Sequence, residues 1–235
     1  MIDSLHRQYQ TEVINLYDLF KKEFLKYFEL DYHSLSEDNK ELFNATAFSI
    51  HYKTIVFPEI NFNPIVKDED FYCLYPNLIK KIKSFCNKMA EITKNKHFLN
   101  NHFLIKKYAL LYELFYPLAH LEKKINIYFE TNYPYLTDYS LKKKIEKFFS
   151  LNFNITIYSA ASLNQNFDSP FLELKNFDLI ITTSTTTIFK NAFKDSSVIY
   201  IQYQNGFSEY DFHTIYSKLK QLVMNQSTLE NNNSF

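Results

Sequence analysis

The sequence predicts two domains, an N-terminal α-helical bundle followed by a small, parallel, four-stranded α/β sandwich. The 235 residues suffice for one large domain or two ordinary ones, and 46% of them are hydrophobic. Apolar residues recur at helical spacing up to about residue 121, and β-branched runs alternate with helical segments after it. We therefore expect the bundle over residues 1–121, the sandwich over 122–224 and a disordered, Asn-rich tail over 225–235.

Four helices are expected in the first half of the chain. The first has a face of apolar residues three and four positions apart, namely Val13, Tyr17, Phe20, Phe24 and Tyr27. The others are predicted from Ser36 to about Val56, after Pro76, and from about Asn101 to Leu121. We expect Glu59–Asp70, which contains Pro64, to be a loop, and Pro117 to kink the end of the fourth helix.

The second half contains short β-branched runs separated by helical segments, a pattern typical of a parallel sheet. Strands are predicted at Ile125–Phe129, Ile155–Tyr158, Asp178–Thr182 and Val198–Ile201. Helices are predicted at Tyr139–Phe149 and Ser208–Met224, with Ser208 as the N-cap of the second. The crossover Ser159–Phe177 is expected to be partly irregular because it is rich in Asn and Ser and contains Pro170.

The composition excludes the commonest nucleotide-binding enzymes. Gly206 is the only glycine, whereas dinucleotide and P-loop phosphate cradles need several glycines. Lys plus Arg total 26, as do Asp plus Glu, so the chain lacks the broad basic field that binds nucleic acid. Arg7 is the only arginine, so the chain has few side chains of the kind that make bidentate contacts to DNA bases and phosphates.

Cysteine usage and hydropathy indicate a cytoplasmic protein. Cys73 and Cys86 form neither a disulfide framework nor a zinc site, and two free thiols fit a reducing compartment. The first residues lack a signal-peptide pattern, and no apolar run approaches the roughly 20 residues needed to span a bilayer. We expect no membrane association, no metal and no cofactor.

Two polar segments follow predicted strands, where open α/β sheets place their ligands. Glu130–Leu136 follows the first strand and either binds an anion at the next helix start or forms a connecting turn, which we favour. Thr182–Thr187 consists of hydroxyl residues and either binds phosphate or a sugar or forms a hydroxyl-capped turn, again the favoured interpretation. The basic stretch Lys142–Lys144 is interpreted as a solvated helix face.

Seven histidines are present, and no two have the spacing of a helical metal pair. Histidine is also the natural carrier of a transferable phosphoryl group. Each histidine alone is more simply explained as a surface or capping residue. We keep three as phosphorylation candidates, namely His51, His97 and His102.

The helical bundle, followed by Lys123–Thr131, a helix and then Asn176–Thr183, resembles the C-terminal half of the Mga/RofA/AtxA-type virulence regulators of Gram-positive bacteria. In that family the bundle is a phosphotransferase-system regulation domain (PRD), and the α/β unit resembles the enzyme IIB component of sugar phosphotransferase systems. The resemblance implies homodimerisation, histidine phosphorylation with transient contact to the histidine carrier protein, and DNA binding only through a further N-terminal region.

The chain departs from this family pattern at two places. Enzyme IIB carries a phosphoryl-accepting cysteine after its first strand, whereas the corresponding loop contains Thr131, Asn132 and Tyr133, which cannot replace a thiolate. The usual PRD histidines would fall near Ala45 or Thr46 and near Tyr112 or Glu113, which leaves His51, His97 and His102 as displaced candidates.

A regulatory, homodimerising module without catalytic residues is therefore the leading functional hypothesis. One alternative is a IIB-type phosphotransferase that uses an acceptor other than cysteine. Another is a plain protein-interaction domain, for which 24 Phe and 19 Tyr could supply an exposed aromatic patch.

Overall fold

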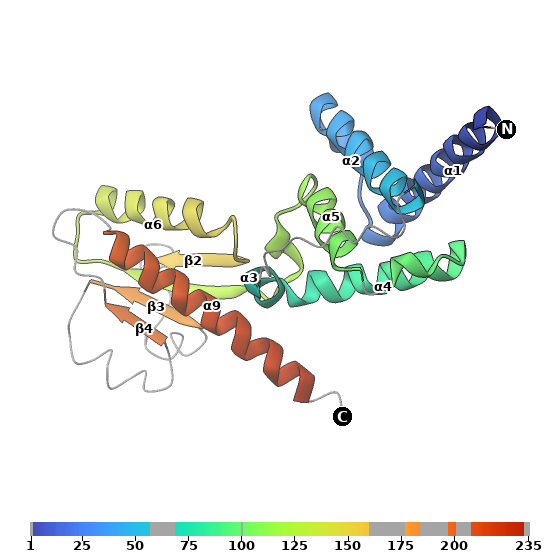
Figure 1. The fold of residues 1–235 in the computed structure, drawn as a ribbon. Coiled ribbons are helices and arrows are strands. Elements are labelled where there is room, and N and C mark those ends of the chain that lie inside the picture. The colour runs from blue at the N-terminus through green and yellow to red at the C-terminus, as the bar shows by residue number, and fades with distance from the viewer. Residues whose placement is uncertain are drawn as a thin grey trace. The chain divides into compact units, whose positions relative to one another are not determined.

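The computed structural model describes residues 2–56, 69–99, 101–159, 177–183, 197–200 and 208–232. The chain divides into two compact units, residues 1–118 and 119–235. The first unit is helical, and the second contains a parallel β-sheet with flanking helices (Figure 1). This arrangement agrees with the predicted class, an α-helical part followed by a parallel α/β part.

The helices of the first unit follow the predicted apolar pattern closely. They are α1 (Ile2–Phe28), α2 (Glu37–Val56), α3 (Glu69–Leu74), α4 (Pro76–Thr93) and α5 (His102–Glu113), with 3₁₀ turns η1 (Tyr32–Ser34) and η2 (Lys96–Phe98). Ser36 accepts a hydrogen bond from the Asn39 N–H at 3.3 Å and so caps the start of α2. Pro76 occupies the first turn of α4, where a missing N–H costs nothing.

Two predictions for this unit are wrong in detail. The fourth predicted helix, α5, ends at Glu113 instead of kinking and continuing to Leu121. Pro117 accounts for the early end, because its ring disfavours helical backbone at the preceding residue and it cannot donate a helical hydrogen bond. Glu69 and Asp70, predicted as the end of a loop, instead open α3. Residues 59–68 of that predicted loop lie outside the described residues.

An aromatic cluster holds the helical unit together. Phe20 of α1 stacks on Tyr108 of α5 with ring centroids 4.8 Å apart and lies 5.8 Å from Phe85 of α4. Phe24 lies 5.5 Å from Phe85 and 6.1 Å from Phe43 of α2. Because all five rings are fully buried, they join α1, α2, α4 and α5 around one core.

The sheet of the second unit is parallel throughout. Its strands are β1 (Ile125–Glu130), β2 (Ile155–Ser159), β3 (Leu179–Thr182) and β4 (Ser197–Tyr200), in the order β2-β1-β3-β4. All four residues of β3 are buried, and β3 lies in the interior of the sheet between β1 and β4. The Asp178 carboxylate accepts the Asn126 N–H at 2.8 Å and extends the β1–β3 pairing by a side-chain contact.

Two helices cover the sheet from one face. α6 (Tyr135–Phe149) contacts β2, and α9 (Glu209–Asn232) contacts β4. The helices also meet each other, since the Phe212 ring of α9 lies 4.7 Å from Phe148 and 5.8 Å from Phe149 of α6. α6 begins directly after Pro134, four residues earlier than the predicted Tyr139. Pro134 has an extended ψ of 147° and its carbonyl accepts the Asp138 N–H at 3.1 Å, so it is the cap residue from which the helix starts.

The predicted N-cap of the last helix is confirmed. Ser208 donates its N–H and hydroxyl to the Asp211 carboxylate at 2.9 and 2.7 Å, and the Asp211 N–H returns a bond of 3.2 Å to the Ser208 hydroxyl. The prediction of a disordered tail from residue 225 is wrong as far as Asn232, where α9 ends. A polar composition marks exposure, and it does not by itself interrupt the backbone hydrogen bonds of a helix that is already formed. Residues 233–235 lie outside the described residues.

Within the described part of the chain, no helix combines the length and hydrophobicity needed to cross a lipid bilayer.

Replacing Phe24 with alanine should lower the free energy of unfolding of the helical unit by about 3 to 5 kcal/mol, since it empties the centre of the aromatic cluster. Urea unfolding or hydrogen exchange of α1 amides measures the change. The control is Leu110→Ala, because the Leu110 side chain is exposed and its loss should shift stability by less than about 1 kcal/mol. Equal effects of the two substitutions would contradict the central role of the cluster.

Candidate functional site

The strand order creates a switch point between β1 and β3. The chain leaves β1 toward β2 on one side, and β3 lies on the other, so the carboxyl ends of β1 and β3 are adjacent. Parallel α/β sheets bind ligands at this kind of position. The predicted loop after the first strand therefore lies where a ligand site is expected.

Side-chain hydroxyls hold this loop in one conformation. The Thr131 hydroxyl donates to Asp138 Oδ1 at 2.7 Å and accepts the Tyr133 N–H at 3.3 Å. The Asn132 N–H donates to Thr183 Oγ1 at 3.0 Å, and the Thr183 N–H donates to the Glu130 carbonyl at 3.2 Å. The three predicted loop residues Thr131, Asn132 and Tyr133 thus contact the end of β3 and the first turn of α6.

The electrostatics of the switch point are acidic. Burial raises the pKa of Glu130, and the neighbouring Asp138 carboxylate raises it further, against the effect of a hydrogen bond from Tyr128. Burial also raises the pKa of Tyr128, together with the charge of Glu130. Two carboxyl groups at the same edge oppose the binding of a phosphoryl group, even at a helix start. The described loop therefore connects β1 to α6 beside two carboxyl groups.

The described residues of the other polar segments of this unit form no second site. Thr182 is buried at the end of β3, while residues 184–187 of the predicted hydroxyl run lie outside the described residues. Lys143 and Lys144 are exposed on α6, and Lys143 pairs with Glu146 at 2.7 Å. Among the described residues, no three His, Cys, Asp or Glu side chains come close enough together to hold a metal ion.

His51 is a core residue of the helical unit, with no exposed surface. Its Nδ1 lies 2.6 Å from the Ala47 carbonyl and its Nε2 lies 3.3 Å from the Tyr108 hydroxyl. Since a carbonyl oxygen only accepts, Nδ1 carries the proton and Nε2 accepts from Tyr108. Its ring also lies 4.3 Å from Phe20. The interpretation of His51 as a surface histidine is wrong, and in this conformation neither ring nitrogen is open to a phosphoryl donor.

His97 and His102 are both exposed, and each lies at a helix start. His97 is in η2, where its N–H donates to Asn95 Oδ1 at 2.9 Å. His102 is the first residue of α5, which is capped by Asn101, and its Nδ1 lies 2.7 Å from the Tyr72 hydroxyl. These two candidates are sterically open to a phosphoryl donor, whereas His51 is not.

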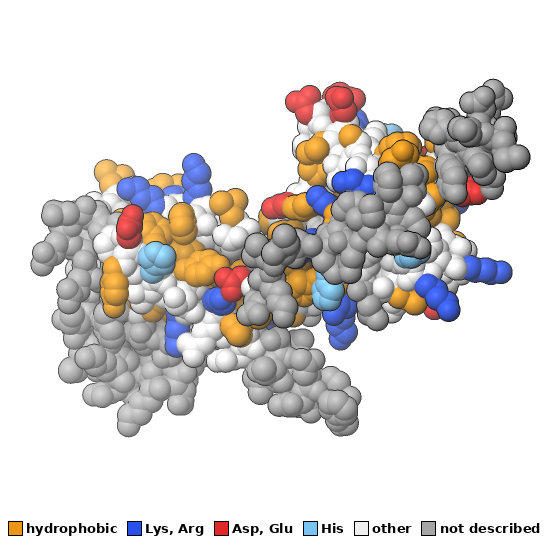
Figure 2. Space-filling view, in the orientation of Figure 1, with side chains coloured by type: hydrophobic (Ala, Val, Ile, Leu, Met, Phe, Trp, Pro, Cys, Tyr) orange, Lys and Arg blue, Asp and Glu red, His pale blue; other side chains and the backbone are white. Residues whose placement is uncertain are grey.

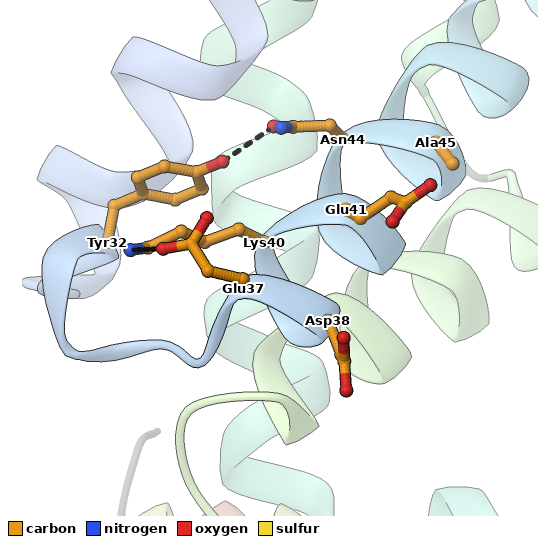
Figure 3. A pocket seen from close by; sticks show the side chains of 7 residues that line it. All are labelled: Tyr32, Glu37, Asp38, Lys40, Glu41, Asn44 and Ala45. Atoms are coloured by element: carbon orange, nitrogen blue, oxygen red, sulfur yellow. Dashed lines mark hydrogen bonds and ion pairs between the residues drawn. The ribbon is translucent and has the colours of Figure 1, made fainter.

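A polar hollow of about 450 Å³ beside the start of α2 was not predicted from the sequence (Figure 3). It is lined by Tyr32, Glu37, Asp38, Lys40, Glu41, Asn44 and Ala45. Asn44 Oδ1 accepts from the Tyr17 hydroxyl at 2.7 Å, Lys21 Nζ at 3.0 Å and the Tyr32 hydroxyl at 3.0 Å. The acidic residues at the start of α2 were visible in the sequence, but the hydrogen bonds to Asn44 come from residues 12 to 27 positions away.

Comparison with known proteins gives no assignment: no protein-family model matches the chain, and no curated protein is detectably similar to it in sequence.

Acid should destabilise the helical unit through His51. Burial lowers the pKa of His51 from 6.5 to about 4, so the unfolded chain binds a proton in a pH range in which the folded chain does not. Stability is therefore complete above pH 6.5 and is lost as the pH falls toward 4, by about 2 kcal/mol between pH 7 and pH 5. Hydrogen exchange of α2 amides at the two pH values measures the loss.

His51→Gln should flatten this pH dependence, because glutamine carries no titrating group, and it should also lower stability at pH 7. The control His97→Gln alters an exposed side chain and should retain the full dependence of the wild type. An unchanged pH profile in His51→Gln would contradict the assignment.

Glu130→Gln should raise the free energy of unfolding of the second unit at neutral pH. A carboxyl group whose pKa is raised by folding stabilises the folded state below its unfolded pKa and loses that contribution as the pH rises through its folded value. The gain should disappear under acidic conditions, where Glu130 is protonated. Denaturant unfolding at both pH values tests this, and a destabilised variant at neutral pH would contradict it.

Proposed function

We propose that the chain is the regulatory and dimerisation region of a Mga-type transcription regulator. In this proposal the helical unit corresponds to the PRD-like bundle and the second unit to the enzyme IIB-like domain. The supporting observation is a parallel α/β unit in which the described residues at the carboxyl ends of β1 and β3 include no cysteine and no histidine. A scaffold that keeps the fold and loses the reactive group suits a regulatory role better than a catalytic one.

The electrostatics of the switch point disfavour the phosphotransferase alternative. Thr131 and Asn132 are engaged in hydrogen bonds with Asp138 and Thr183, and neither is a nucleophile at neutral pH. The carboxyl groups of Glu130 and Asp138 would repel an incoming phosphoryl group. The described part of the second unit contains no cysteine that could take the place of the missing thiolate, since both thiols lie in the helical unit.

The exposed histidines provide a route for regulation by phosphorylation. A phosphoryl group adds about −1.5 to −2 charges. At His102 this charge would lie beside the N-terminus of α5, where the helix dipole favours an anion. It would also change the contact between His102 and Tyr72 of α3. His102 is therefore the preferred acceptor, with His97 as the second choice.

Incubation with phosphoenolpyruvate, enzyme I and the histidine carrier protein, followed by intact mass and peptide mapping, tests this route. We expect phosphate on His102 or His97, and its loss in the double variant His97→Gln/His102→Gln. His51→Gln serves as the matched control and should keep the modification. Phosphate on the Glu130–Leu136 loop would instead support the phosphotransferase alternative, and no phosphate on any residue would exclude this form of regulation.

Dimerisation is tested separately by light scattering and sedimentation at tens of micromolar protein. The proposal expects a homodimer. A strict monomer at that concentration would overturn the dimerisation role and leave a plain interaction domain as the better description.

A further inference from the structure

We propose that the α1–α2 groove is a docking site for a basic amphipathic helix of another protein. We use this name for the hollow beside the start of α2 together with the surface stripe that continues from it along α2 and the adjacent part of α1. The stripe consists of Asp38, Glu41, Ala45, Phe48, Tyr52, Ile14, Tyr17 and Lys21. One end of it is acidic and the other is aromatic. This inference goes beyond the proposed regulatory role and does not depend on it.

The acidic end is the hollow at the start of α2. Figure 2 shows acidic side chains gathered at one end of this helix. Glu37 pairs with Lys40 at 2.8 Å, so these two charges offset each other. Among the described residues, neither Asp38 nor Glu41 has an ion pair or a side-chain hydrogen bond, and both are exposed. The hollow thus presents two exposed carboxylates without an ion pair, while the Lys21 ammonium that binds Asn44 lies deeper between α1 and α2.

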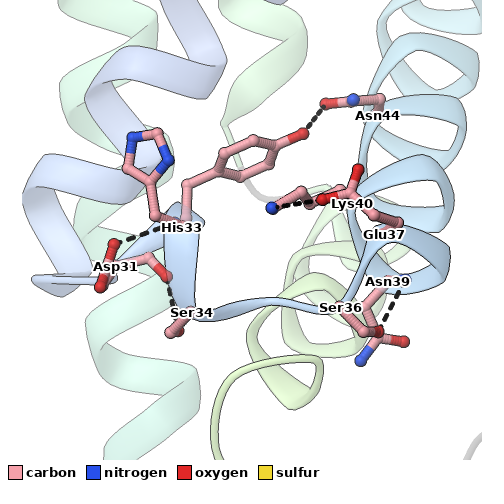
Figure 4. Close-up of polar contacts among 9 residues, drawn as sticks. Asp31, His33, Ser34, Ser36, Glu37, Asn39, Lys40 and Asn44 are labelled. Atoms are coloured by element: carbon pink, nitrogen blue, oxygen red, sulfur yellow. Dashed lines mark hydrogen bonds and ion pairs between the residues drawn. The ribbon is translucent and has the colours of Figure 1, made fainter.

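The floor of the hollow is already ordered. Asn44 receives three hydrogen bonds from α1 and η1, and Lys21 Nζ lies 3.8 Å from the centre of the Tyr32 ring. Asp31 and Ser36 fix the connection that precedes α2 through backbone bonds to His33 and Asn39 (Figure 4). Because little rearrangement is needed, binding here would avoid most of the entropy cost of ordering a loop.

The aromatic end follows on the same side of α2. Phe48 and Tyr52 are each 41% exposed and stack with ring centroids 6.4 Å apart, and Phe48 also contacts Tyr17 at 6.1 Å. Ile14, one turn before Tyr17 on α1, is 49% exposed. Exposed aromatic side chains on an ordered helix are typical anchors of a protein interface.

The distribution of apolar residues on α2 supports this interpretation independently. Apolar side chains occur on both sides of α2, whereas those of α4 lie almost entirely on one side. The buried side of α2, with Phe43, Ala47 and Ile50, accounts for its packing in the core. A helix side that carries large apolar side chains is normally buried against another element. The second apolar side of α2 is therefore explained by an additional partner.

The spacing of the stripe fits a helix as that partner. Positions 38, 41, 45, 48 and 52 alternate steps of three and four residues, as in helices that pack side by side. The distance along α2 from Asp38 to Tyr52 is about 21 Å, the length of a helix of about 14 residues. A complementary helix would place Lys or Arg against Asp38 and Glu41 and apolar residues against Phe48 and Tyr52.

Charge selects a basic partner over a second copy of this chain. A twofold pairing of α2 in antiparallel orientation would place Asp38 and Glu41 against the Phe48 and Tyr52 rings of the other copy, and so desolvate carboxylates without a cation. A parallel pairing would place carboxylates against carboxylates. The chain's own residues 221–235 contain no lysine or arginine and do not complement the acidic end.

A designed peptide tests the proposal on the full chain. The probe is a fluorescent helix of about 16 residues with two arginines one turn apart at one end and leucines at heptad positions along the rest. We expect saturable binding by anisotropy that weakens as ionic strength rises. Equal binding of a scrambled peptide of the same composition, or of a peptide with glutamates in place of the arginines, would overturn the proposal.

Protein variants separate the two ends of the groove. Asp38→Asn/Glu41→Gln should weaken binding about three- to tenfold at low ionic strength, and Phe48→Ser about tenfold at any ionic strength. Matched controls on other exposed surfaces are Glu91→Gln and Leu110→Ser, which should leave affinity unchanged. The charge variant removes no described side-chain contact, so it should fold normally. Unchanged affinity in that variant would contradict the proposal.

Photo-crosslinking fixes the orientation and the identity of the occupant. A crosslinker at the leucine end of the peptide should label residues near Phe48 and Tyr52, and one at the arginine end should label residues 37–41. Labelling elsewhere would overturn the assignment. If Phe48→Ser converts a dimer into a monomer in the absence of peptide, the groove is a contact between two copies of this chain and the proposal of a basic partner is wrong.

Discussion

The stacking of Tyr108 on Phe20 is the contact on which the helical unit depends. It joins α5 to α1, and the same two rings enclose His51 of α2, 4.3 Å from Phe20 and hydrogen-bonded to Tyr108. A charged imidazole at this position would be surrounded by rings, with few polar groups to stabilise it. The cluster therefore sets the position of α2 and keeps its only histidine neutral.

In the second unit, the strand arrangement and the side chains at its edge have to be considered separately. Strand order brings the ends of β1 and β3 together, and this depends only on parallel pairing and crossover direction. Whether the position reacts depends on the side chains there. Thr131, Asn132 and Thr183 use their polar groups to bind one another and Asp138, and the remaining charge is carried by carboxyl groups. The strand arrangement of a ligand edge is therefore present, whereas the charged side chains described there are carboxyl groups.

The sequence predicted structure best where residues a few positions apart decide it, as in apolar spacing and helix capping. Apolar spacing located α1, α4 and α6, the helix start signal at Ser36 located α2, and the Ser208 cap was predicted because capping involves residues only three positions apart. The sequence did not predict contacts between side chains that lie far apart along the chain. Nothing near His51 indicates that Phe20 and Tyr108 will enclose it, and the Asn44 hydrogen bonds join residues from three elements. The predicted end of α5 is too late because Pro117 ends the helix, whereas the sequence predicts only a kink in the last turn.

Core packing explains the buried side of α2 but not the apolar residues on its exposed side. Its buried side agrees with the core, but Phe48 and Tyr52 lie on the opposite side, where a solvent-facing helix normally carries charged residues. Exposed apolar residues that core packing does not explain are typical of functional surfaces, because folding alone gives no reason for them. The same helix carries His51 inside and the groove outside. A partner that binds only folded α2 would, by linkage, also oppose the unfolding that protonation of His51 favours.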